Sequence, residues 1–173
     1  MKTFTADSIR NIVLTGHGGS GKTALAEAML FKCGLTDRMG NTADGNTVCD
    51  FDAEEIRRKI SINAAVANAV WFDTKINIID APGQFDFIGG MHEGIRAAES
   101  VIITVNGKDG VCPGTIKAYN LALEQNKARM LAVTWMEVEN SDFYRLHTEL
   151  KTVFGPSLCP IVVPYDKNGP VDA

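Results

Sequence analysis

One stretch near the amino terminus carries residue types that can hold phosphate. It matches the pattern G-x-x-x-x-G-K-[ST] and consists of Gly16, His17, Gly18, Gly19, Ser20, Gly21, Lys22 and Thr23. Glycines let backbone N–H groups point into one concavity, and a following helix adds its partial positive charge. In this pattern Lys22 reaches the β and γ phosphates, and Thr23 places its hydroxyl on Mg²⁺, which prefers oxygen ligands. The stretch therefore predicts a site for a polyphosphate with magnesium, in which we expect His17 to shape the loop.

Apolar residues on both sides predict the elements that position this loop. Residues 12–15 read as a short buried strand, whereas Ala26, Met29, Leu30 and Cys33 recur at helical spacing. Strand, glycine loop and helix thus follow one another in the order that the phosphate loop requires. The alternative is an ordinary glycine-rich turn between a strand and a helix.

A predicted hairpin leads to a second group of polar residues. Apolar residues alternate over 60–66, continue over 70–72, and return over 75–79 after a turn at 73–74. The returning strand ends at residues 80–84, which include Asp80, Gly83 and Gln84. An α/β sheet presents its ligands there, outside the carboxyl ends of its strands.

The rest of the chain continues this alternation of strands and helices. We expect strands at residues 101–105, 130–134 and 161–163, a helix with Ile116, Tyr119 and Leu123 at helical spacing, and an amphipathic helix over 143–154. Such alternation implies an α/β fold, with a mostly parallel sheet covered by helices on both faces. Residues 34–52 suggest no regular element, and so long a loop is usually functional or disordered.

Composition excludes several classes of protein. The 173 residues are 45% apolar and 22% charged, as in an ordinary globular domain, and the net charge is −4. Without a run of basic residues, no patch for direct nucleic-acid binding is expected. The four cysteines are scattered, which favours a reducing cytoplasm over disulfides or zinc, and apolar stretches fall short of a membrane helix. We expect a cytoplasmic monomer.

These motifs together resemble the amino-terminal, GTP-binding domain of translation elongation factor G, in particular its elongation factor G-like branch. The separations from Lys22 to Ser61, from Ser61 to Asp80 and from Asp80 to Glu137 agree with the family, and the resemblance covers nearly the whole chain. It implies a P-loop NTPase fold, Mg²⁺-dependent hydrolysis of GTP to GDP, and the ribosome as a partner through the parent protein. The chain ends before the family's fifth motif and its later domains. We therefore expect residues 1–173 to be a single GTP-binding domain, either an amino-terminal fragment of a larger multidomain factor or a natural truncated relative.

The resemblance also assigns roles to individual residues. Asp80 would hold Mg²⁺ through a water, Gly83 would offer its N–H to the γ-phosphate, and Ser61 stands where a family threonine caps Mg²⁺ in the GTP state. Gln84 replaces a histidine that orients the attacking water, and its amide can still accept and donate, so Gln84 and Lys22 are the catalytic candidates. Ser61 lacks the methyl group that restricts χ1, which implies a looser switch. We expect its loop to be disordered without γ-phosphate, because residues 34–52 carry few apolar side chains.

The largest departure from the family lies at Thr134, Trp135 and Glu137, where the family reads N-K-x-D and recognises guanine. Thr134 lacks the asparagine amide, and the Glu137 carboxylate lies one methylene farther out than that of aspartate. A mismatched hydrogen bond to the base costs about 1–3 kcal/mol, which would lower guanine selectivity about tenfold to a hundredfold. Trp135 either stacks on the purine or packs at a strand end.

This departure leaves a second function open beside the GTPase. It is a degenerate nucleotide-binding or interaction module that has lost guanine selectivity and most turnover. A third possibility, a kinase acting on a small molecule, lacks a visible acceptor site and an arginine-rich lid.

Overall fold

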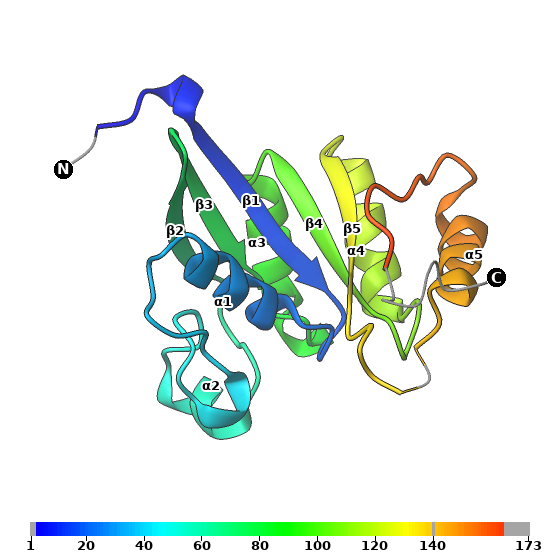
Figure 1. Ribbon diagram of the computed structural model, residues 1–173, viewed down its shortest axis with the longest axis horizontal. Coiled ribbons are helices and arrows are strands. Elements are labelled where there is room, and N and C mark those ends of the chain that lie inside the picture. The colour runs from blue at the N-terminus through cyan, green and yellow to red at the C-terminus, as the bar shows by residue number, and fades with distance from the viewer. Residues whose placement is uncertain (1–2, 140, 165–173) are drawn as a thin grey trace.

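The computed structural model describes residues 3–139 and 141–164, in which five strands form one sheet (Figure 1). The strands are β1 (Ile9–Gly16), β2 (Ala65–Trp71), β3 (Thr74–Asp80), β4 (Ser100–Asn106) and β5 (Ala128–Thr134). The helices are α1 (Lys22–Lys32), α2 (Ala53–Arg58), α3 (Ile88–Ala97), α4 (Pro113–Glu124) and α5 (Phe143–Phe154). Single 3₁₀ turns lie at η1 (Ala6–Ser8), η2 (Thr42–Asp44) and η3 (Phe85–Phe87). In this part of the chain, no helix is long and apolar enough to cross a membrane.

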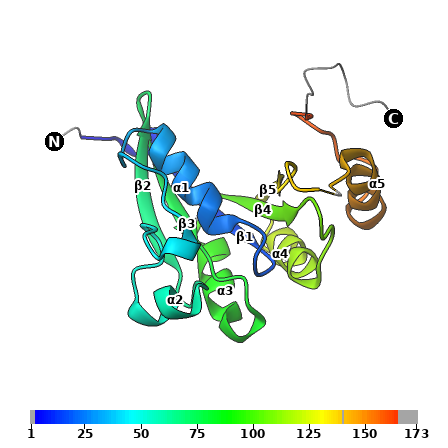
Figure 2. The same cartoon turned by 60° about the horizontal axis from the view of Figure 1, so that its bottom comes forward.

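The sheet has the order β2-β3-β1-β4-β5, and only β2 is antiparallel to its neighbour. The parallel strands β3, β1, β4 and β5 therefore end at the same edge. The loops that follow Gly16, Asp80, Asn106 and Thr134 leave from this edge, which is the lower one in Figure 1. The segment around α2 lies beyond the same edge (Figure 2). The predicted mostly parallel α/β fold is confirmed.

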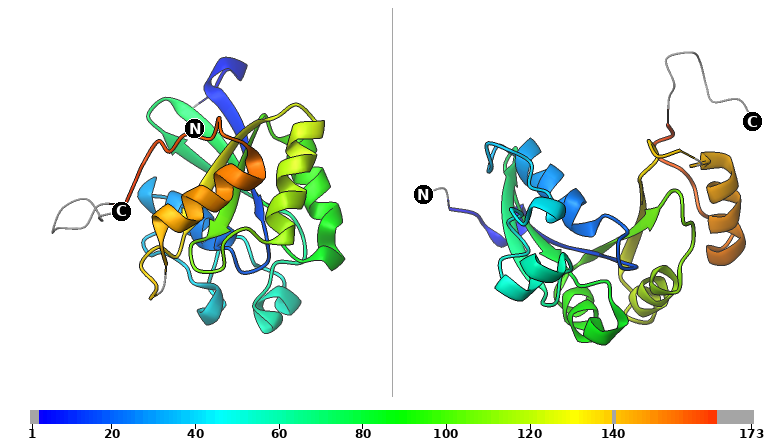
Figure 3. Two further views of the ribbon diagram at one scale, coloured as in Figure 1. Left: turned by 90° about the vertical axis from the view of Figure 1, so that its right-hand side faces the viewer. Right: turned by 90° about the horizontal axis from the view of Figure 1, so that it is seen from below.

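Helices cover both faces of the sheet, because successive residues of a strand point to opposite sides. Val13 and its neighbours pack with α3 and α4, whereas Leu14 and its neighbours pack with α1. Seen from below in Figure 3, α1 lies on one side of the sheet and α3 and α4 lie on the other. Helix α5 lies next to α4, with the ring centroids of Tyr119 and Phe154 4.3 Å apart. Two apolar layers thus hold β1 in the centre of the sheet. They thereby also position the loop that follows β1.

The predicted strand at residues 161–163 is wrong. Ile161, Val162 and Val163 belong to no strand, and their side chains are 84%, 83% and 55% exposed. β-Branched residues are enriched in strands because their side chains fit a pleated, half-buried surface. That preference forms a strand only where another strand offers it a free edge, and no described strand pairs with this segment.

The start of the predicted hairpin is also wrong. The chain forms α2 at residues 53–58, and β2 begins only at Ala65. Asp52 begins this helix through a capping box: its carboxylate accepts the N–H of Glu54 at 2.8 Å, and the Glu55 carboxylate accepts the N–H of Asp52 at 3.1 Å. The hairpin turn lies at Phe72 and Asp73, one residue earlier than predicted.

Helix α4 buries a different face from the one that its large residues suggest. Ile116 and Leu123 are 38% and 52% exposed. The face toward the sheet consists of small residues together with Leu121: Gly114, Thr115, Ala118, Leu121 and Ala122. Small side chains let the helix lie close to β1 and β4. Of the three residues at helical spacing, Tyr119 packs against this core, whereas Ile116 and Leu123 remain exposed.

Residues 34–52 contain no helix or strand except the short turn η2, in agreement with the sequence. The segment nevertheless has an apolar anchor, because Cys49 is 3% exposed in the core beneath α1. Burial raises the pKa of the Cys49 thiol, and the nearby carboxylates of Asp80, Glu27, Asp50 and Glu55 raise it further. The disorder of this segment in the absence of γ-phosphate stays a prediction.

Candidate nucleotide site

The loop between β1 and α1 is held in a tight bend by its own polar groups. Gly19 and Gly21 have φ angles of 76° and 82°, a region that favours glycine. The Ser20 hydroxyl donates to the carbonyl of His17 at 2.7 Å and lies 2.6 Å from the Thr104 hydroxyl of β4. The loop is therefore tied to a second strand of the sheet.

Lys22 directs its ammonium group into this loop. Its Nζ donates to the carbonyl of His17 at 2.8 Å, and the side chain is 6% exposed. Burial lowers the pKa of Lys22 to about 8, although Asp80 and Asp50 raise it in part. A Cβ atom on Gly83 would overlap the Lys22 Nζ, so the loop after β3 passes directly over the ammonium. A buried cation between two loops is well placed to meet phosphate oxygens.

Next to Lys22, two hydroxyls and a carboxylate converge. The Thr23 hydroxyl donates to Asp80 Oδ2 at 2.7 Å and lies 3.3 Å from the Ser61 hydroxyl, which donates to Asp50 Oδ1 at 2.7 Å. Asp80 is 1% exposed, and its Oδ1 has no hydrogen-bond partner among the described residues. Burial raises the pKa of Asp80 to about 7, opposed by the Thr23 hydrogen bond and by Lys22.

This donor set suits a hard cation that also takes phosphate oxygens. Thr23, Ser61 and Asp80 supply oxygen atoms only, as Mg²⁺ prefers. Within residues 3–139 and 141–164, no three histidine, cysteine, aspartate or glutamate side chains gather around a metal position. Because Mg²⁺ in such sites is usually shared between one or two protein groups and substrate phosphates, oxygens of a bound phosphate would complete this set.

Gln84 lies across the phosphate loop. A Cβ atom on Gly18 would be 2.6 Å from Gln84 Nε2 and 3.0 Å from its Cδ, so a side chain at residue 18 would push the Gln84 amide aside. The neighbouring Phe85 ring packs edge-on against His17, with centroids 6.3 Å apart. The Gln84 amide thus faces the loop from the β3 side.

The far end of the site is built by the last residue of β5 and the residues that follow it. The Thr134 hydroxyl donates to the carbonyls of Ser20 at 2.9 Å and Val105 at 3.2 Å, so its proton is used within the protein. Trp135 has a positive φ of 58°, and a Cβ atom on Gly21 would be 3.3 Å from its Nε1. The indole therefore lies against the loop at the edge of the cavity.

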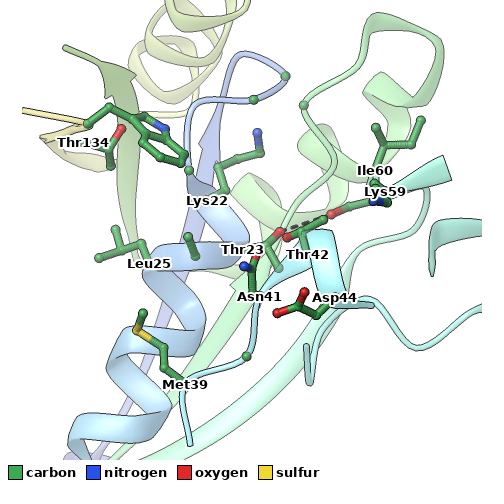
Figure 4. Close-up of a pocket in the computed structure, with 18 of the residues that line it drawn as sticks. Lys22, Thr23, Leu25, Met39, Asn41, Thr42, Asp44, Lys59, Ile60 and Thr134 are labelled. Carbon is green, nitrogen blue, oxygen red and sulfur yellow. Dashed lines mark hydrogen bonds between the residues drawn. The ribbon is translucent and has the colours of Figure 1, made fainter. Parts of the chain in front are cut away.

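Most of these groups border one cavity of about 800 Å³ (Figure 4). The residues that the sequence singled out and that line it are Gly18, Gly19, Gly21, Lys22, Thr23, Ser61, Gly83, Gln84, Thr134, Trp135 and Glu137. The other four, Gly16, His17, Ser20 and Asp80, do not line the cavity; Gly16, Ser20 and Asp80 are buried and His17 is half-buried. The structure thus brings the sequence-predicted residues together.

Several residues of the site have no counterpart in the sequence-based prediction. Residues 39–42, Asp44, Lys59 and Ile60 form a further wall of the cavity, and Asp50 and Glu27 lie buried behind it. Asp50 has no local signal, because it follows a segment without apolar periodicity. Glu27 has a weak one: it lies one helical turn after Thr23 on the face of α1 that Ala26 buries.

A phosphate loop between a strand and a helix, with a buried carboxylate at the end of the neighbouring strand, defines a P-loop nucleotide-binding domain. Residues 7–167 match the family model described as the elongation factor Tu GTP binding domain, and the chain belongs to this family.

Comparison with individual proteins shows which members of this family the chain resembles. The chain is 33% identical over 156 residues to an elongation factor G-like protein of Mycobacterium tuberculosis, covering 90% of this chain and 22% of that protein. It is 32% identical to elongation factor G of Granulibacter bethesdensis (95% and 24% covered) and to mitochondrial ribosome-releasing factor 2 of Culex quinquefasciatus (97% and 22% covered). The chain thus spans less than a quarter of these relatives. The resemblance to elongation factor G and its G-like branch is confirmed.

Solved structures agree with this assignment. A crystal structure of a Thermus thermophilus protein superposes with a TM-score of 0.83 at 34% identity, covering 86% of this chain and 22% of that one. The bacterial selenocysteine-specific elongation factor EF-Sec superposes with a TM-score of 0.65 at 27% identity, covering 83% and 23%. The chain is a GTP-binding domain of the kind found in elongation factor G-like translation factors.

Proposed function

We propose that this domain binds GTP and GDP together with Mg²⁺ and hydrolyses GTP to GDP and phosphate. The observation that carries the proposal is the convergence at a phosphate loop of Lys22 Nζ, the Thr23 hydroxyl and Asp80 Oδ1, an oxygen that no described residue hydrogen-bonds. A buried cation, a hydroxyl and a carboxylate oxygen in this order suit phosphate oxygens and a hard metal ion.

Each group in the cavity has a distinct task in this proposal. The loop of residues 16–23 and Lys22 hold the β and γ phosphates, and Lys22 stabilises the charge that develops on them. Gln84 orients the attacking water through its amide. Thr23, Ser61 and Asp80 would hold Mg²⁺, which when bound neutralises phosphate charge and fixes the phosphate geometry.

The names of the relatives support a place in translation. We propose that the parent protein of this domain acts on the ribosome, since relatives are named elongation factor G and ribosome-releasing factor 2. The proposal also takes this protein to be cytoplasmic and monomeric. Contact with ribosomal RNA would come from other parts of the parent, because this domain carries a net charge of −4 and no basic run.

One observation favours a second candidate, a nucleotide-binding module with reduced guanine selectivity. The Thr134 hydroxyl donates its proton to backbone carbonyls, and a threonine has no amide to offer to a base. Guanine would then be recognised mainly by Glu137 and by stacking on Trp135.

Calorimetric titration with GTP and with ATP, in Mg²⁺ and in EDTA, tests both candidates, and phosphate release measures turnover. The GTPase proposal expects tighter binding of GTP than of ATP, weaker binding in EDTA, and phosphate release that falls in Gln84→Ala while GTP affinity is kept. Equal affinities without phosphate release would support the second candidate. Binding of neither nucleotide would overturn both.

A further inference from the structure

A single buried carboxylate holds both ends of the loop from Gly40 to Val48. The Glu27 side chain is 1% exposed on α1. Its Oε2 accepts the N–H of Gly40 at 3.1 Å, and its Oε1 accepts the N–H of Val48 at 2.6 Å. Because each oxygen takes one backbone donor, Glu27 closes the loop and ties it to the helix that begins at the phosphate loop.

The loop is shaped to fit this contact. A Cβ atom on Gly40 would overlap the Glu27 carboxylate and would lie 2.9 Å from the carbonyl oxygen of Asn46. Inside the loop, the N–H of Asn41 donates to the Asn46 side chain at 2.7 Å, and the Asn41 side chain accepts the N–H of Ala43 at 3.0 Å. The loop therefore holds its own form and meets α1 through Glu27.

This loop and the residue before it form a wall of the nucleotide cavity. Met39, Asn41, Thr42 and Asp44 face the cavity alongside α1, as Figure 4 shows, whereas Glu27 does not line it. Besides the charge that it places near Asp80, Glu27 can therefore act on the cavity through the position of this wall.

The other buried glutamate of the region acts differently. Glu55 is also 1% exposed, and it accepts the N–H groups of Asp52, Ile62 and Asn63. All three donors belong to the segment that carries Glu55 itself. Glu55 therefore stiffens that segment, whereas Glu27 connects the wall to the rigid body of the domain.

We propose that Glu27 is a positioning residue for the nucleotide site, which retains bound nucleotide by holding the wall at residues 39–44 against α1. This inference rests on the proposed function. Exchanging the carboxylate for an amide keeps one accepting oxygen but turns an NH₂ group toward the other backbone N–H. The charge-assisted hydrogen bond from either Gly40 or Val48 is then lost, and the backbone N–H of that residue is left buried without an acceptor.

Dissociation of fluorescent GDP and tryptic cleavage after Arg38, next to the loop, measure the two consequences. Glu27→Gln should release GDP about tenfold faster, the effect expected for one such hydrogen bond. It should also be cut faster after the exposed Arg38 in the absence of nucleotide. Gly40→Ala should act in the same direction from the loop side, and the double variant should be no worse than the stronger single variant, because both disrupt one contact.

Glu149→Gln is the matched control. Its carboxylate on α5 accepts the backbone N–H of Val111 at 3.0 Å, which is the same kind of contact away from the cavity. This variant should release GDP and be cut after Arg38 at the rates of the parent.

A folded Glu27→Gln that matches the parent in GDP release and in Arg38 cleavage would overturn the inference, and so would additive effects of the two substitutions. If Glu27→Gln does not fold, the rates of GDP release and of cleavage after Arg38 in Gly40→Ala test the inference instead. If the parent binds no nucleotide, the proposed function fails by itself. The cleavage rate then still tests whether Glu27 holds the loop.

Discussion

Replacing Lys22 with methionine should abolish nucleotide binding and at the same time stabilise the nucleotide-free domain. Both effects have one cause: a buried ammonium is costly without an anion and is needed when phosphate is present. Methionine keeps an apolar stem of similar length, so the exchange removes the charge without opening a large cavity.

The magnitude follows from the pKa of the buried group. Burial lowers the pKa of Lys22 from 10.5 to about 8. At about 1.36 kcal/mol per pKa unit, keeping the ammonium charged at pH 7 costs the folded state about 3 kcal/mol. Loss of its hydrogen bond to the His17 carbonyl offsets about 1 kcal/mol of the gain, so we expect a net stabilisation of about 2 kcal/mol.

The advantage of the variant depends on pH in a defined direction. Because the pKa in the folded state lies below that in the unfolded state, the parent carries the full penalty below about pH 8. The penalty decreases as the pH rises, and it vanishes above 10.5, where the lysine is neutral in both states. The difference in stability between Lys22→Met and the parent should therefore be largest near neutral pH.

Urea denaturation without nucleotide or Mg²⁺, at pH 7 and at pH 10, measures this difference, and calorimetry with GTP measures binding. Lys117→Met removes an exposed lysine and serves as the control, with little change in either quantity. If Lys22→Met is less stable than the parent at pH 7, burial of the Lys22 ammonium does not cost the folded state the free energy stated above. A variant with the GTP affinity of the parent would refute the phosphate-loop interpretation.

Two further predictions concern catalysis and base recognition. Gly18→Val should displace the Gln84 side chain, because even a Cβ atom at residue 18 would be 2.6 Å from Gln84 Nε2. Phosphate release measured in a single turnover should then slow about a hundredfold, whereas GTP affinity should be largely kept. Unchanged phosphate release would show that Gln84 has no part in turnover. Combining Thr134→Asn, Trp135→Lys and Glu137→Asp should raise the ratio of GTP to ATP affinity about tenfold by calorimetry. A ratio equal to that of the parent would exclude this segment from base recognition.

Local sequence was sufficient wherever a motif and its flanking elements are contiguous. The phosphate loop lies between β1 and α1 as predicted, and Asp80, Gly83 and Gln84 follow β3. These residues meet because parallel strands end at one edge of the sheet, which is a consequence of the strand and helix order. The strand expected at 161–163 failed for the opposite reason, since a strand depends on a partner that is remote in sequence.

The sequence by itself determined the fold class, the family and the residue types of the site, because all three are encoded in short motifs and in their spacing. Only the tertiary structure decided which buried carboxylates support that site. Glu27 can bind the loop because α1 passes beneath it, and the loop begins thirteen residues later in the chain. Asp50 supports the site because the fold brings its carboxylate next to the Ser61 hydroxyl. Contacts of this kind join segments without any periodic signal, so they exist only once the packed chain brings donors and acceptors together.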